Sequence, residues 1–444
     1  MSDRSNLGAP GIGAMPPHYR RNATMFVLDM FCFRVASSFV NGSTVLPVLV
    51  ATLSRSELVV GIAQGLIDGA WFLPQLLTAS WMAGVTRKKR FCVRAVVVGR
   101  SLLFPLAVMV GFWGAERPRL VLFATILTFF VFYVADGIAS VPWFEILAKA
   151  LPDRRRGRVL GLGQVIGGMA GIGVGMAVRW ILSDASPWTF PANYGVLLGL
   201  AACVFWLGMG PLLGLKEPEW EERSERPPTI RETLRSLPDI LRRDPAFARL
   251  IVVRFLNSFA GVAMAFYVLH GRENLGFDAA DIGLFVSAQV FGSLLAGFVT
   301  GLVQDRYGPL VHMRCLLLLG AAPPILALLA LPLQSVMGDA LVYYYVLLYG
   351  VIGVYIGSFG WPYINWVFEH TQEAERPLYV GLMNTFAAMA MLAPPLGGLL
   401  VSQFSYQVAF VTALVFALAA LAASVGLADT RRGRDGATAA ESTG

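Results

Sequence analysis

Twelve apolar runs, each long enough to cross the roughly 30 Å hydrocarbon core of a bilayer as a helix, make up most of the sequence. Charged residues are 14% of the chain, whereas a soluble protein averages about 25%. Lipid is the solvent that tolerates so much apolar surface. We therefore predict an all-α polytopic membrane protein with twelve transmembrane helices. The runs fall near residues 25–53, 57–83, 91–113, 119–148, 155–183 and 192–214, and then near 247–270, 279–304, 310–333, 340–368, 377–402 and 405–427.

The longest polar stretch lies between the sixth and seventh runs and includes the amphipathic sequence TIRETLRSLPDILRR. It divides the chain into two sets of six helices. The expected organisation is an N-terminal tail over 1–24, a six-helix half over 25–214, a linker over 215–246, a second half over 247–428 and a C-terminal tail over 429–444.

Lysine and arginine lie almost entirely in alternate loops, those that share a side of the membrane with the termini. The exceptions outside the apolar runs are Arg55, Arg117, Arg119 and Arg272. Loops rich in Lys and Arg stay in the cytoplasm, so we expect both termini to be cytoplasmic and the protein to reside in the plasma (cell inner) membrane. The same clustering explains the formal charge of +7 without a nucleic-acid partner.

The two halves repeat one another. The first helix contains FRVASSFV and the seventh contains VRFLNSFA, which aligns Arg34 and Ser38 with Arg254 and Ser258. The interval from Gly61 to position 79 equals that from Gly283 to position 301. Internal symmetry of this kind is typical of transporters built from two related halves.

The loop between the eighth and ninth runs resembles the GxxxDRxGxxxxR signature of the major facilitator superfamily. The matching residues are Gly301, Asp305, Arg306, Gly308 and Arg314. In the equivalent loop between the second and third runs, Ala83 and Gly84 replace the acid and the arginine. The resemblance implies two six-helix bundles that rock against each other. It also assigns the five matching residues to a cytoplasmic gate. It implies no such charged gate in the first half.

Glycines recur at four-residue steps on three predicted helices. They are Gly163, Gly167, Gly171 and Gly175; Gly61, Gly65 and Gly69; and Gly297 and Gly301. Small residues at this spacing let helices approach closely in lipid. In the superfamily these helices meet across the interface between the halves, so we expect either smooth sliding surfaces or static packing there.

Charges inside the apolar runs are functional candidates because their burial in lipid is costly. At 1.5 Å per residue, Arg34 lies nearest in depth to Asp136, with Asp68 next. We expect a buried Arg34–Asp136 pair, with Arg34–Asp68 as the alternative. Arg100 and Arg179 are interpreted as structural, and Asp29 and Glu145 as hydrated residues near the inner interface.

Further polar and aromatic side chains share helix faces with these charges, on helices that surround the central cavity in the superfamily. The complete set of candidate substrate or ion ligands is Arg34, Asn41, Gln64, Asp68, Asp136, Trp143, Arg254, Asn257, Trp361 and Asn365. Each also has a plainer interpretation as a helix–helix hydrogen bond.

Motifs of enzymes are absent from the sequence: it contains no GK[ST], HExxH or GxSxG. Cys32, Cys92, Cys203 and Cys315 show no metal-binding or disulfide spacing. We expect a monomeric secondary transporter without cofactors, which moves a small organic solute by alternating access and couples it to protons through Asp68 or Asp136. A non-transporting receptor and a lipid or lysolipid flippase are the alternatives. Organic phosphates and amphipathic or cationic compounds both remain open as substrates.

Overall fold

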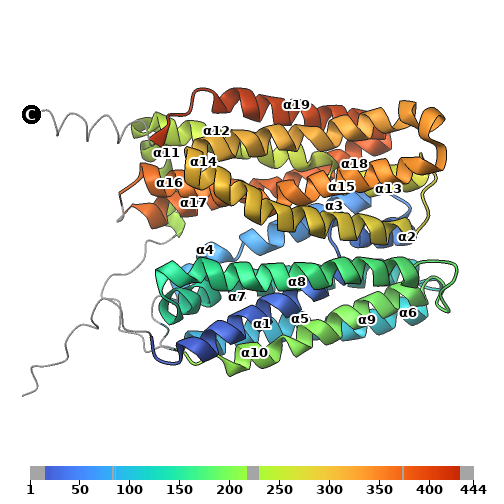
Figure 1. Ribbon diagram of the computed structural model, residues 1–444, viewed down its shortest axis with the longest axis horizontal. Coiled ribbons are helices and arrows are strands. Elements are labelled where there is room, and N and C mark those ends of the chain that lie inside the picture. Colours follow the sequence, from blue (N-terminus) through green and yellow to red (C-terminus); the bar gives the residue numbers. More distant parts are fainter. Residues whose placement is uncertain (1–15, 83–84, 86, 218–229, 373–374, 431–444) are drawn as a thin grey trace, which may run out of the picture.

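The computed structural model describes residues 16–82, 85, 87–217, 230–372 and 375–430. Its described part is all-helical and forms two groups of helices that lie side by side (Figure 1). Ala83 and Gly84, where the first copy of the loop signature departs from its pattern, lie outside the described residues. So do residues 218–229 of the linker and both ends of the chain.

Six spans form the first group, and several are built from two consecutive helices. The elements are α1 (Tyr19–Phe39) with α2 (Val45–Ser54), α3 (Glu57–Phe72) with α4 (Gln75–Met82), α5 (Lys88–Ser101) with α6 (Leu103–Trp113), α7 (Pro118–Ala150), α8 (Asp153–Ile181), and α9 (Ala192–Leu207) with α10 (Met209–Gly214).

The second group follows the linker helix α11 (Ile230–Arg243). Its elements are α12 (Pro245–Phe259), η1 (Ala260–Ala263) and α13 (Phe266–Glu273); α14 (Asp281–Met337); η2 (Gly338–Ala340); α15 (Leu341–Ser358) with α16 (Trp361–His370); α17 (Arg376–Ala388), η3 (Met389–Leu392) and α18 (Ala393–Gln403); and α19 (Tyr406–Ser424). At Gly308, φ is 87°. This left-handed backbone conformation favours glycine, and it divides α14 into the eighth and ninth spans.

The expected twelve spans are confirmed. Eight helical stretches among the described residues are long and apolar enough to cross a membrane, and the stretch Asp281–His370 contains three of the spans. The first two spans complete the count. Their helices break near Asn41 and Pro74, so neither forms one long apolar helix.

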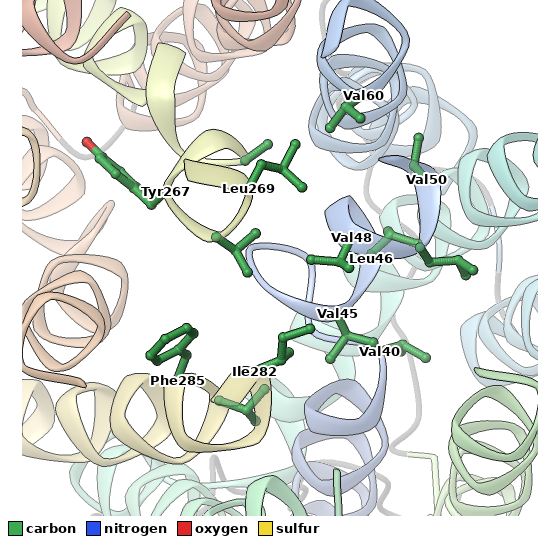
Figure 2. Close-up of a cluster of buried hydrophobic side chains, with 14 of the residues drawn as sticks. Val40, Val45, Leu46, Val48, Val50, Val60, Tyr267, Leu269, Ile282 and Phe285 are labelled. Atoms are coloured by element: carbon green, nitrogen blue, oxygen red, sulfur yellow. The ribbon is translucent and has the colours of Figure 1, made fainter. Parts of the chain in front are cut away.

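The end of the bundle where α1 begins and Thr430 lies is called the terminal face below. At the opposite end, α2 packs against α13 and the start of α14. Buried side chains from both halves meet there, among them Val45 and Val48 on one side and Leu269, Ile282 and Phe285 on the other (Figure 2). We call this contact the apolar seal.

Several glycines of the repeats lie at close contacts between the halves. Gly61 and Gly65 lie against the main chain of Pro394 and Met391, and Gly175 lies against Gly283. The predicted close approach is therefore confirmed for α3 with α18 and η3, and for the distal part of α8 with α14. Four of the predicted glycines do not make such a contact. Gly163 and Gly167 face α1 within their own half, and no atom lies within 4 Å of a Cβ built at Gly297 or Gly301.

These contacts predict that adding a methyl group has different effects at two glycines of α14. A Cβ added at Gly283 would collide with main-chain atoms of Gly175 and Arg179, whereas one at Gly297 would meet no atom within 4 Å. We expect Gly283→Ala to lower the free energy of unfolding by about 1–3 kcal/mol, and Gly297→Ala to change it by no more than about 0.5 kcal/mol. Thermal unfolding of the purified variants measures both. Equal stabilities would contradict the close packing.

Candidate functional site: a cavity between the halves

A cavity of about 870 Å³ lies between the two halves. Its walls come from α1 and α8 on one side and from α14, α15 and α16 on the other. Gly157, Asp305 and Glu369 form its rim near the terminal face, and Asn41 and Gln289 lie at its inner end, beneath the apolar seal. The cavity is thus open towards the terminal face and closed at the other end.

Polar side chains line much of this space. They are Arg34, Ser37, Ser38, Asn41, Gln164, Gln289, Ser293, Thr300, Gln304, Asp305, His312, Asn365 and Glu369. Of the ten ligand candidates, four belong to the lining: Arg34, Asn41, Trp361 and Asn365. Gly301 and Asp305 of the loop signature line it as well.

A small hydrogen-bond network joins the halves at the inner end. The Oδ1 atom of Asn41 accepts from the main-chain N of Ser43 at 2.9 Å and lies 3.0 Å from its hydroxyl. That hydroxyl is also 2.7 Å from Oε1 of Gln289 on α14. Ser43 is buried, so this polar contact is shielded by the apolar seal above it.

The expected ion pair between Arg34 and Asp136 is absent from the described residues, and so is the alternative with Asp68. Arg34 faces α8, where its Cβ lies beside Gly167, and it borders the cavity. Asp136 instead accepts from Trp71 Nε1 at 3.1 Å, and Asp68 accepts from Gln64 Nε2 at 2.8 Å. The prediction compared depths along the helices only, and depth does not tell in which direction α1 turns Arg34.

Asp29 corrects a second expectation, because it is buried rather than hydrated. Its exposed fraction is 6%, Trp143 Nε1 donates to its Oδ2 at 2.9 Å, and Arg100 Nη2 lies 3.9 Å from its Oδ1. Arg100 also donates to the main-chain oxygen of Phe205 at 2.9 Å. An arginine buried within an apolar run is stabilised by a partner such as a carboxylate. This need of Arg100 is the signal that could have led to Asp29. Glu145 pairs with Lys88.

In the second half, Arg254 and Asn257 are buried and do not line the cavity. The guanidinium carbon of Arg254 lies 4.3 Å from the ring centre of Phe359 and 4.6 Å from that of Tyr363. Contacts of this kind are favourable cation–π interactions. Asn257 accepts from the hydroxyl of Tyr355 at 3.0 Å. Arg254 therefore aligns with Arg34 in sequence but lies in an aromatic enclosure.

The loop signature is divided between the cavity and the packing of the second half. Arg314 Nη2 lies 3.2 Å from the main-chain oxygens of Ser424 and Val425, at the end of α19. Arg306 lies over the ring of Tyr307. Gly308 provides the break described above. The role of these residues in a gate stays a prediction.

The chain beyond α19 is tied to α16 at the rim of the cavity. Trp366 Nε1 donates to the main-chain oxygen of Ala428 at 3.2 Å, and the hydroxyl of Thr430 donates to Glu369 Oε2 at 2.6 Å. The segment that follows the last span thus contacts the helix that carries Trp361 and Asn365.

The two arginines of the first half should respond differently to replacement. Arg100→Met leaves Asp29 buried without its cation, which typically costs about 3–5 kcal/mol unless the carboxylate takes up a proton. Arg34→Met breaks no ion pair, so we expect a loss of no more than about 0.5 kcal/mol. Unfolding of both variants in detergent at neutral pH measures the difference, and Asp29→Asn in the Arg100→Met background should recover stability. Equal losses of stability in the Arg100→Met and Arg34→Met variants would contradict the pairing of Arg100 with Asp29.

Known proteins share this architecture. The model of the Major Facilitator Superfamily matches residues 30–389 and 261–443. A bacterial homologue of the iron transporter ferroportin in an inward-facing state is 14% identical, with a TM-score of 0.66 over 92% of this chain and 98% of its own. The nucleoside transporter NupG is 13% identical (TM-score 0.65, covering 93% and 100%), and a D-xylose-proton symporter is 13% identical (TM-score 0.62, covering 91% and 97%). No curated protein matches the chain. The chain belongs to the major facilitator superfamily and is a secondary transporter of the membrane, not an enzyme.

Proposed function

We propose that the protein is a proton-coupled transporter of a small organic solute that works by rocking one half against the other. The observation that carries this proposal is the cavity between the halves, open towards the terminal face and closed opposite by the apolar seal. Alternating access needs such a site, reachable from one side at a time. The amide and hydroxyl lining supports a water-soluble solute over a lipid. A receptor on the same scaffold remains the alternative, and it would bind without transport.

We propose further that the terminal face is cytoplasmic, which would make this conformation inward-open. The clusters of Lys and Arg in the loops of that face support this orientation. The division into halves over 25–214 and 247–428, joined by the linker and flanked by the two tails, belongs to the same proposal. So do the location in the cell inner membrane and the monomeric state.

Proton coupling is supported by the charges of the first half. Asp29, Asp68 and Asp136 lie within its membrane-spanning helices, together with Arg100, which lies beside Asp29. A carboxylate without a full ionic partner in such surroundings can exchange a proton during a transport cycle. Asp136 is bonded to Trp71 of α3, and α3 packs against α18 across the interface. A change in its protonation would therefore act beside the surface on which the halves move.

Replacing the proposed proton carrier should separate coupling from transport. In proteoliposomes that contain a pH-sensitive dye, solutes from a panel of sugars, nucleosides, organic anions and organic amines should drive proton entry with the wild type. We expect Asp136→Asn to abolish solute-driven proton movement while exchange of labelled solute continues. Glu116→Gln, an exposed carboxylate, serves as the control.

Retained proton movement in Asp136→Asn would transfer the proposed role to Asp68, which the matching Asp68→Asn variant tests. Binding without any solute or proton movement in the wild type would favour the receptor.

The proposed gate predicts an effect of charge removal at the end of the eighth span. Asp305→Asn should slow transport with little change in stability, because it removes one charge at the rim of the cavity. A cysteine at Ser293, in a chain with Cys32, Cys203 and Cys315 replaced by Ser, should then be labelled faster from the terminal face. Asp339→Asn, an exposed acid outside the cavity, is the matched control. Unchanged labelling together with normal transport would contradict the gate.

A further inference from the structure

The charged residues of the cavity are separated along its length. Arg34 is fifteen residues beyond the start of α1, roughly 22 Å into the bundle at 1.5 Å per residue. The acids Asp305 and Glu369 both line the rim, since Asp305 lies just before the break at Gly308 and Glu369 near the end of α16. The deep part of the lining therefore carries a positive charge and the entrance carries negative ones.

Arg34 differs from the other membrane-embedded arginines in its surroundings. Arg100 has Asp29 beside it, and Arg254 is enclosed by the rings of Phe359 and Tyr363. In the part of the chain that the structure describes, no carboxylate lies within 4 Å of the Arg34 guanidinium. Arg34 borders the cavity instead. A cation desolvated in this way gains most from an anion that enters the cavity.

The two amides at the inner end of the cavity, of which Asn41 lies seven residues beyond Arg34, add donors rather than acceptors. Ser43 occupies the amide oxygens of both Asn41 and Gln289. The bond from the main-chain N of Ser43 fixes the orientation of the Asn41 amide, because an N–H can donate only to the oxygen. The NH₂ groups of Asn41 and Gln289 thus remain as donors at the cavity wall, one from each half, along with the guanidinium of Arg34.

We infer that the inner end of the cavity binds the anionic group of its substrate, so that the transported solute is a small organic anion such as a carboxylate or an organic phosphate. This inference rests on the proposed transport function, whose substrate class it specifies. The amide oxygens of Asn41 and Gln289 are already bonded to Ser43, so a cationic group is less well served at this end than an anionic one. Because Asn41 and Gln289 also hold the Ser43 contact between the halves, an anion bound to their NH₂ groups would occupy the point where the halves join.

The sign of the potential at this end can be measured without knowing the substrate. Ser37 lines the cavity one helical turn from Arg34, so Ser37→Cys, with Cys32, Cys203 and Cys315 replaced by Ser, reports the local potential. We expect the anionic reagent sulfonatoethyl methanethiosulfonate to react faster than its trimethylammonium counterpart, relative to a free thiol, by on the order of fivefold.

Adding Arg34→Gln should abolish the anionic preference at Ser37→Cys, whereas Arg119→Gln, which removes an exposed arginine far from the cavity, should leave it unchanged. A cationic preference at Ser37→Cys, or a preference that survives Arg34→Gln, would overturn the inference.

Ligand binding gives a second, independent test of the anion class. Benzoate and phenyl phosphate, which resemble benzamide and benzylamine in size, should raise the thermal stability of the wild type, and the neutral and cationic compounds should not. We expect Arg34→Gln and the isosteric Asn41→Asp each to weaken the effect by about tenfold or more. Stronger stabilisation by benzoate would indicate a carboxylate as the substrate's anionic group, and stronger stabilisation by phenyl phosphate would indicate a phosphate. Stabilisation by benzylamine alone, or no stabilisation by either anion, counts against the anion class.

The proposed transport function and the proposed anion class can be refuted independently of each other. Proton-coupled movement of an amine or a sugar in proteoliposomes would refute the anion class and leave the transporter intact. A positive potential and anion binding without movement of any solute would support the anion class and refute the transport function.

Discussion

The apolar seal between α2, α13 and the start of α14 determines the state in which the molecule is observed. It consists mainly of aliphatic and aromatic side chains from both halves, which contribute stability in proportion to the area they bury rather than through directional bonds. A contact of this type can separate and form again without leaving a specific partner unsatisfied. With the halves joined at this end, the space between them remains at the other, and that space is the cavity.

Backbone contacts at glycine complement the seal. Gly175 with Gly283, and Gly61 with Pro394, bring main chain against main chain, so the halves approach closely at these points. Surfaces of this kind permit close packing in lipid, where no hydrophobic effect drives helices together. They also offer little resistance to a small rotation of one half on the other. The seal and these contacts together define where the interface is tight and where it is open.

The sequence was sufficient to predict the twelve spans, the interruption between the eighth and ninth spans and part of the tight glycine contacts. Each of these depends on local properties: the length of an apolar run, the backbone freedom of glycine, or the spacing of small residues. The partners of the buried charges were not predictable in the same way. Arg34 and Asp136 lie at similar depths, yet α1 turns Arg34 towards α8, while Asp136 meets Trp71. Depth can be counted along a chain, but the rotation of a helix about its axis is set by all its neighbours. Asp29 was misjudged for this reason, since its partner Arg100 lies on another helix.

The contacts of the segment after α19 have a practical consequence. Ala428 and Thr430 are bonded to Trp366 and Glu369 of α16, the helix whose other end carries Trp361 at the cavity wall. A truncation that removed Ala428 and Thr430 would therefore not be a neutral shortening of the chain. It would take away both bonds to the helix that carries Trp361 and leave Glu369 at the rim without the Thr430 hydroxyl.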